Sequence, residues 1–239
     1  MKPYHNVPIH ECHEPLLPLP LQEFAVVTPH PYVALGAPYG ERSPYWLRQT
    51  VVEALRRVQA ALQAAQPGWR LQVFDAYRPI PVQQFMVDYT TQDLAHQQGL
   101  DWPQLSVAQQ QTLLETVYQF WALPSPDPKT PPPHSTGAAI DLTLIDAQGL
   151  PVAMGSPIDE VSARSRPDYF QAAAADHAQF HAHRCLLQQL MTAAGFQQHP
   201  AEWWHFSNGD QLWAWLTTQQ TGQFTVAHYG CAEPPPRSA

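Results

Sequence analysis

The most informative stretch of this chain is residues 131–144, PPPHSTGAAIDLTL. Asp141 lies inside the apolar run AAIDLTL, which is typical of a buried β-strand. A carboxylate in such a strand is costly to bury unless it is paired, hydrogen-bonded or bound to a metal. A proline-rich loop delivers His134 just ahead of the strand, and Gly137 permits the sharp turn between them. We therefore expect His134 and Asp141 to converge on one point, with a third ligand coming from elsewhere.

The composition indicates a compact globular protein. Of the 239 residues, 44% are apolar and only 13% are charged, which does not fit a disordered chain. The formal net charge of −8, without a basic stripe, argues against nucleic acid as a partner. Cys12, Cys185 and Cys231 are widely spaced and odd in number, so they are not a disulfide framework and fit a reducing compartment.

The first residues, MKPYHNVPIHECHEPLLPLP, carry prolines and charges where a signal peptide needs an unbroken apolar region. No run approaches the ~20 apolar residues that a membrane helix requires. We expect a soluble, cytoplasmic protein that has no membrane partner. The same segment contains His5, His10, Cys12 and His13, which could bind a second metal, but a proline-punctuated surface segment is the simpler interpretation.

We expect an α+β fold, with helices packed around a small, mainly antiparallel sheet. The chain is within the size range of one domain, so residues 1–239 are expected to form a single domain. Helices are predicted at 45–65, 81–97, 106–122 and 167–194, and strands at 70–74, 139–144, 201–207 and 224–229, with a hairpin at 150–154. On the last helix His177 and His181 lie one turn apart without an intervening glutamate, which favours a solvated helix face over a metal site.

The segment 201–207, AEWWHFS, supplies the missing nitrogen ligand and a spare carboxylate. His134, Asp141 and His205 form a set of two nitrogens and one oxygen, which suits one Zn²⁺ per chain. Three protein ligands leave a fourth position for water, as in catalytic zinc sites. Glu202 is the candidate to take the proton from the attacking water. Because side chains alternate along a strand, Glu202 must reach the site from a bend or from the strand's end.

Arg78 follows the predicted strand 70–74 and is fixed by Pro79, so we expect it to point into a cleft and stabilise an oxyanion. The alternative is a surface arginine paired with Asp75. The metal ligands also have simpler interpretations from the residues alone. His134 could be a turn residue and Asp141 a buried hydrogen-bonding acid.

Four motifs occur in order: DAYRP at 75–79, H-x-x-G-x-A-x-D at 134–141, MGSPID at 154–159 and EWWHF at 202–206. Together they resemble the VanX-type D-alanyl-D-alanine dipeptidases, a branch of the zinc D,D-peptidases with a Hedgehog-like fold. The resemblance covers about residues 32–206 and leaves 207–239 as a C-terminal extension. It implies zinc binding by His134, Asp141 and His205, a general base at Glu202, and transition-state assistance by Arg78.

The resemblance also implies how substrate is bound. Asp159 matches the aspartate that holds the substrate's free amino group, with Ile158 in place of the usual phenylalanine. Tyr32 is the match for an early tyrosine that contacts the same amine. The family serine that helps receive the substrate's carboxylate is Pro132 here, so that carboxylate must use other groups or bind more weakly.

The implied activity is hydrolysis of the dipeptide D-alanyl-D-alanine to two D-alanines by metal-activated water. One alternative is a D,D- or L,D-carboxypeptidase that trims longer peptidoglycan peptides. Another is a zinc-containing binding module without turnover, although such a module has no use for Glu202 and Arg78. The oligomeric state is left open by the sequence.

Overall fold

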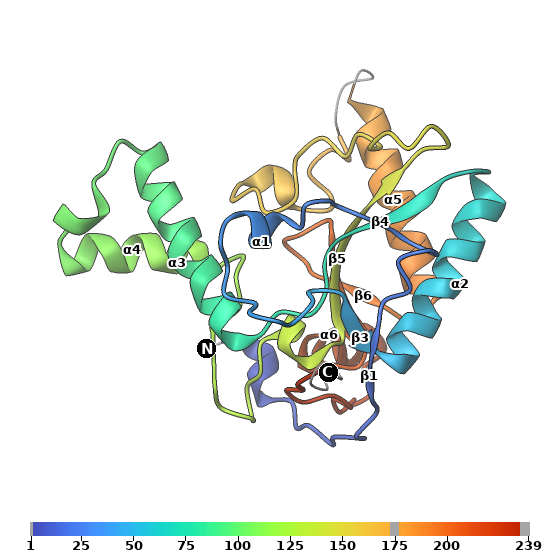
Figure 1. The fold of residues 1–239 in the computed structure, drawn as a ribbon, viewed down its shortest axis with the longest axis horizontal. Coiled ribbons are helices and arrows are strands. Elements are labelled where there is room, and N and C mark those ends of the chain that lie inside the picture. Colours follow the sequence, from blue (N-terminus) through green and yellow to red (C-terminus); the bar gives the residue numbers. More distant parts are fainter. Residues whose placement is uncertain (1, 173–176, 235–239) are drawn as a thin grey trace.

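The computed structural model describes residues 2–172 and 177–234, which form a mixed α+β fold as predicted (Figure 1). In that part of the chain, five strands make the main sheet. Their order is β2 (Ala25–Val26), β4 (Arg70–Asp75), β5 (Ala139–Ile145), β7 (His205–Ser207) and β6 (Gln197–Gln198). Only the β2–β4 pair among these is parallel. A separate antiparallel pair joins β1 (Leu16–Pro18) to β3 (Trp46–Arg48). The sheet is therefore mainly antiparallel, as expected.

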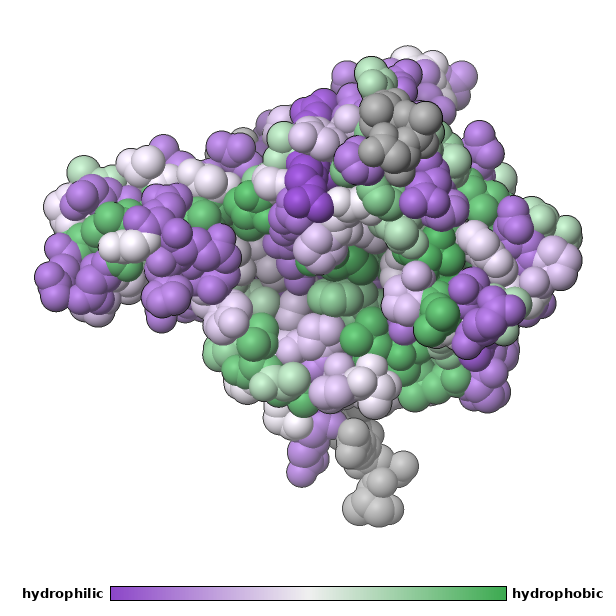
Figure 2. Space-filling view, turned by 90° about the horizontal axis from the view of Figure 1, so that it is seen from above, coloured by the Kyte–Doolittle hydropathy of each residue, from purple (hydrophilic) through white to green (hydrophobic). Residues whose placement is uncertain are grey.

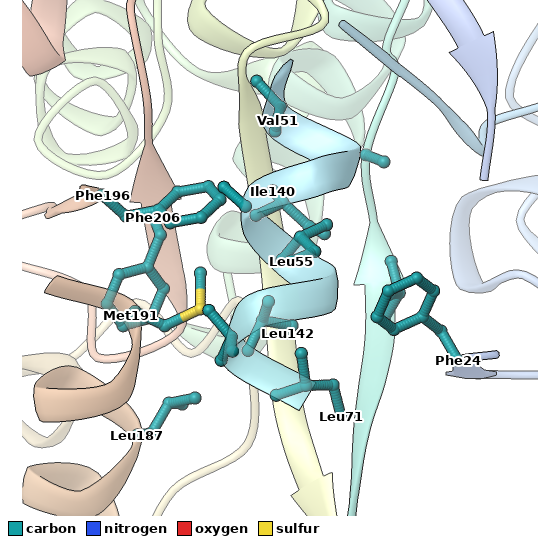
Figure 3. Packing of buried hydrophobic residues seen from close by; sticks show 14 of the residues in the cluster. Phe24, Val51, Leu55, Leu71, Ile140, Leu142, Leu187, Met191, Phe196 and Phe206 are labelled. Atoms are coloured by element: carbon teal, nitrogen blue, oxygen red, sulfur yellow. The ribbon is translucent and has the colours of Figure 1, made fainter. Parts of the chain in front are cut away.

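Helices α2 and α5 cover one face of the main sheet and enclose the largest core (Figure 3). Leu55 of α2 and Met191 of α5 belong to the same buried cluster as Leu142 of β5. None of the described helices is both long and apolar enough to cross a membrane. The helices are α1 (Pro31–Ala34), α2 (Gln49–Ala65), α3 (Ile80–Gln97), α4 (Val107–Val117), α5 (Ala178–Ala193) and α6 (Gln211–Thr221).

Strand alternation separates the core from a polar row on the other face of the sheet. Ile140 and Leu142 of β5 enter the core with Phe206 of β7. The intervening side chains of Asp141 and His205 therefore face away from the core. Register places Asp141 directly opposite His205 on β7, and a shift in β4 places Asp75 opposite Asp141 on the other side. Three polar residues thus line up across three adjacent strands.

Helices α3 and α4 form a hairpin that projects from the body of the protein (Figure 1). Its outer surface is largely hydrophilic (Figure 2). Its inner end packs in a second apolar cluster that includes Tyr32, Met86, Val117 and Trp121. This cluster fixes Tyr32 and Trp121 beside the polar row of the sheet.

Several predicted boundaries were wrong. Residues 46–48 are a strand rather than the start of a helix, because they pair with β1. Helix α4 ends at Val117 instead of continuing to 122. Helix α5 begins at Ala178. Its predicted start at 167 falls among turns, and 173–176 lie outside the described residues. Hydrophobic spacing alone could not separate these turns and the edge strand from helix.

The C-terminal segment differs most from prediction. No strand forms at 224–229 in the described chain, where Ala227 makes only an isolated bridge to Ile9. Helix α6 was missed, although Asp210 caps its first turn by accepting the Trp213 N–H and Gly222 follows its last residue with φ +73°. Both are recognised helix-end signals. They were overlooked because the sequence between them, which is rich in tryptophan and glutamine, shows no clear helical spacing of apolar residues.

Candidate active site

One group of three potential metal ligands is found among residues 2–172 and 177–234, and it consists of His134, Asp141 and His205. Their ligand atoms all lie within 4.8 Å of one another, and the three residues are buried. His134 Nε2 is 3.2 Å from His205 Nδ1, and that nitrogen is 3.0 Å from Asp141 Oδ1. Two imidazoles and a carboxylate that converge in this way form a donor set suited to a divalent metal. The structure thus brings the three predicted ligands together.

Local backbone geometry and strand register position these ligands. His134 lies in the 3₁₀ turn Pro133–Thr136, which ends at Gly137 with φ +70°. A Cβ atom at Gly137 would collide with the side chain of Leu16, so glycine is required there for two reasons. Asp141 is the third residue of β5, and His205 opens β7 directly opposite it. The turn and the register together produce the convergence.

Hydrogen bonds indicate which nitrogen of each histidine is available to a metal ion. His134 donates its Nδ1–H to the Ala76 carbonyl at 2.7 Å, which leaves Nε2 as its potential ligand atom. His205 donates from Nε2 to Ser207 Oγ at 3.3 Å, and Ser207 donates to Asp210 Oδ2 at 2.8 Å. The Nδ1 of His205 is then the free ligand atom. Such outer contacts orient metal-binding histidines and raise their basicity.

Ser207→Ala should weaken metal binding by about 10- to 100-fold, because it removes the acceptor that orients the His205 ring. The fold should remain, since Asp210 still caps α6 through the Trp213 N–H. Competition with a metal-sensitive chelating dye measures the change. Thr112→Ala, which removes an exposed hydroxyl on α4, is the matched control. An unchanged metal affinity in Ser207→Ala would show that this contact has no role in holding the metal.

Glu202 lies in the irregular segment before β7, so it reaches the site from the strand's end. Its Oε2 is 3.8 Å from His205 Nδ1, and its Oε1 is 3.7 Å from His199 Nδ1. Burial and the nearby charges of Asp141 and Asp159 raise the pKa of Glu202 well above its ordinary value. A buried carboxyl group with a raised pKa, placed beside metal ligands, is suited to accept and return a proton.

Arg78 is buried rather than exposed, so the surface alternative is wrong, although the pairing with Asp75 exists. Its Nη2 and Nε donate to Asp75 Oδ2 at 2.7 and 3.0 Å, and its Nη1 donates to Gln83 Oε1 at 2.9 Å. Burial alone would raise the pKa of Asp75, but the Arg78 charge and the hydrogen bond from His30 lower it to about 2. Arg78 is thereby held rigidly at the edge of the ligand group, 3.4 Å from Asp141 Oδ2.

Tyr32 and Asp159 meet on the other side of Arg78. The Tyr32 hydroxyl donates to Asp159 Oδ2 at 2.8 Å and lies 3.3 Å from Arg78 Nη2. Asp159 has the unusual φ of +65°. Burial and the charge of Asp141 raise the pKa of Asp159 to about 7. The structure therefore places Asp159 in the wall of the cavity at the ligand group and Tyr32 in contact with Asp159 and Arg78.

A cavity of about 40 Å³ lies against the ligands and is lined by Arg78, Asp159 and Glu202. Sequence reasoning missed several other lining residues, namely Lys2, Tyr4, Gln83, Trp121, His199 and Leu212. Ser207 could have been found, because strand alternation puts it on the same face as His205. The N-terminal lining residues carry no comparable signal in the sequence.

Other histidine clusters do not assemble a metal site in the described ranges. The N-terminal set His5, His10, Cys12 and His13 is not gathered into a group of three ligands there. His181 instead lies against Cys185, whose Sγ is 3.4 Å from its Nε2. The ligand group on the sheet face is therefore the one candidate metal centre among those residues.

The chain is similar to known dipeptidases along most of its length. The family model described as D-Ala-D-Ala dipeptidase (Peptidase_M15) matches residues 26–227. The D-alanyl-D-alanine dipeptidase of Synechocystis sp. is 47% identical over 241 residues, covering 98% of this chain and 98% of that protein. The D-alanyl-D-alanine dipeptidase of Escherichia coli K12 is 41% identical over 73 residues, which is 30% of this chain and 36% of that protein.

Two solved structures are similar to this chain at much lower sequence identity. The zinc-bound D,D-pentapeptidase VanY, in a mutant form, aligns with a TM-score of 0.44 and 16% identity, covering 86% of this chain and 89% of that one. The LD-carboxypeptidase LdcB aligns with a TM-score of 0.46 and 16% identity, covering 88% and 76%. The range matched by the family model contains every predicted site residue but excludes Lys2 and Tyr4.

Proposed function

Because this chain belongs to the D-Ala-D-Ala dipeptidase family, we propose that it hydrolyses D-alanyl-D-alanine to two D-alanines with one bound zinc ion. The observation that carries the proposal is the direct pairing of Asp141 with His205 across β5 and β7, which completes a three-ligand group beside Glu202. A binding module would need the metal ligands but not a buried carboxyl group and a buried arginine at the same cavity.

The residues present fit a zinc ion. Zinc favours imidazole nitrogen and carboxylate oxygen, and both histidines offer a nitrogen whose ring partner is already hydrogen-bonded. Burial alone would raise the pKa of Asp141, but His134 and His205 hold it well below its ordinary value, so this ligand is ionised. Bound at this group, zinc supplies Lewis-acid chemistry that activates water and polarises the scissile carbonyl.

The side chains around the ligands have three further roles, namely proton transfer, oxyanion stabilisation and binding of the substrate's amino group. Glu202 accepts a proton from the attacking water and delivers it to the leaving amine as the C–N bond breaks. Arg78 donates to the oxyanion that forms on the carbonyl oxygen, and its fixation by Asp75 and Gln83 means that little reorganisation is needed. Asp159 and Tyr32 hold the free amino group of the dipeptide, which selects against peptides with a blocked or extended N-terminus.

The test is D-alanine release from D-Ala-D-Ala by the purified protein, with L-Ala-L-Ala and N-acetyl-D-Ala-D-Ala as comparison substrates. We expect cleavage of the free D,D-dipeptide alone, its loss on treatment with a chelator, and its return on addition of zinc. Efficient cleavage of the acetylated peptide would replace the dipeptidase by a carboxypeptidase acting on longer peptidoglycan peptides. A zinc-loaded protein that cleaves none of these would contradict the proposal.

We also propose a single-domain, cytoplasmic protein. The three cysteines form no disulfide, which supports a reducing compartment. Cell fractionation with an antibody against the protein tests the location, and recovery in the extracellular fraction would contradict it.

A further inference from the structure

The N-terminal arm, residues 2–7, forms one wall of the active-site cavity. Its 3₁₀ turn Pro3–Asn6 packs beside α6, and the side-chain amide of Gln211 donates to the Val7 carbonyl at 2.6 Å. Tyr4 is buried and lines the cavity together with Lys2. In Figure 1 the arm lies at the lower left, whereas the segment that follows β5 crosses the upper part of the molecule. The arm is therefore a fixed part of the site, although it is far from the ligands in sequence.

The cavity wall carries three acidic side chains and two basic ones. Asp141, Asp159 and Glu202 line it, and Arg78 and Lys2 are the lysine and arginine residues among its described lining. Arg78 is already assigned to the oxyanion, and its Nε, Nη1 and Nη2 also donate to Asp75, Gln83, Tyr32 and Asp141. Lys2 differs, because within the described residues its Nζ makes one long hydrogen bond of 3.4 Å, to the Gln119 carbonyl, and no ion pair. Its ammonium group can still donate to a ligand.

A free dipeptide has two charged ends that need partners once they leave water. Asp159 is placed for the amine, so the carboxylate needs a cation elsewhere on the cavity wall. The histidines do not provide it, because His134 and His205 face the metal position. His199 accepts the Ala201 N–H at its Nδ1. That nitrogen therefore carries no proton, and the ring is not a cation. Pro132 has neither a hydroxyl nor an N–H to offer.

We propose that Lys2 binds the C-terminal carboxylate of the dipeptide substrate and makes a free carboxylate a requirement for efficient cleavage. This inference rests on the proposed dipeptidase activity and names a substrate-binding residue outside the range that the family model matches. Burial lowers the pKa of Lys2 while the charge of Glu202 acts in the opposite direction, which supports the closeness of Lys2 to the reacting groups. The two ends of the dipeptide are thus bound by the N-terminal arm and by the segment that carries Asp159.

The experiment compares D-Ala-D-Ala with D-alanyl-D-alaninamide, which keeps the amine and the scissile bond but lacks the carboxylate charge. Wild-type protein, Lys2→Met and Lys2→Arg are assayed with a purification tag at the C-terminal end. Lys129→Met is the matched control, because Lys129 is exposed and is the only other lysine in the chain. Release of D-alanine gives kcat and KM for each substrate.

We expect Lys2→Met to lower kcat/KM for D-Ala-D-Ala by about 10- to 100-fold, mainly through KM, as loss of a charge-assisted hydrogen bond predicts. Its activity on the amide should match that of the wild type, which also shows that the variant is folded. Lys2→Arg should retain most of the preference for the acid, and Lys129→Met should retain all of it.

Equal losses on both substrates would overturn the proposal, since Lys2 would then act through Glu202 or through the fold. No loss on either substrate would overturn it as well. Failure of the wild-type protein to cleave D-Ala-D-Ala would instead remove the dipeptidase activity on which the proposal rests. These outcomes are distinct, because only the last one is seen without any substitution.

Discussion

Glu202→Gln should reduce turnover of D-Ala-D-Ala by about 10²- to 10⁴-fold while the protein still binds the metal ion proposed above. Glutamine has nearly the same shape as glutamate but cannot accept a proton from the attacking water. Because the three ligands come from other residues, metal content should stay at one ion per chain. Steady-state kinetics and elemental analysis of the same preparation measure both effects.

Two features make this result informative. Glu202 is buried and carries a raised pKa, so a neutral amide of equal size should not disturb packing. Glu53→Gln, an exposed change on α2, is the matched control and should leave turnover and zinc content unchanged. Loss of zinc from Glu202→Gln would instead identify Glu202 as part of the metal centre and remove it from the role of base.

His205→Ala should lose both the metal and the activity. Loss of a residue that only orients a ligand weakens metal binding by at most roughly 100-fold. Removal of a direct ligand should weaken it more, so the effect should exceed that of Ser207→Ala. Isothermal titration with zinc and the dipeptide assay measure the two losses. The expected order of metal affinity is wild type, then Ser207→Ala, then His205→Ala.

The fold should survive this substitution. Phe206 keeps β7 anchored in the core, and Asp141 remains paired with His134 and Arg78. Circular dichroism should therefore show a folded protein. His96→Ala, an exposed histidine on α3, controls for a general effect of histidine loss. An active His205→Ala protein that contains no metal would contradict the candidate metal centre.

Much of the candidate site could be predicted from the sequence because it depends on local rules. An apolar strand with one aspartate, preceded by a histidine and a glycine turn, predicts that the Asp141 side chain leaves the core face and that His134 lies at the end of the strand. The second histidine and Glu202 stand three apart, which predicted that Glu202 would reach in from outside the regular strand. Each of these inferences uses only alternation, turn geometry and the cost of a buried charge.

The sequence by itself therefore predicted the α+β character and the convergence of His134 and Asp141, and its four motifs together indicated His205 as the third ligand and Glu202 as the spare carboxyl group. Only the tertiary structure decided that Arg78 is buried against Asp75, that Ser207 and Asp210 orient His205, and that Lys2 lines the cavity. Lys2 lies far from the other cavity residues in the chain, so no local pattern specifies its contact with them, and the short-range contacts of Arg78 and His205 become buried only in the complete fold. These arrangements arise because packing of α6 and of the α3–α4 hairpin brings the arm and the sheet face together, which is a property of the whole fold.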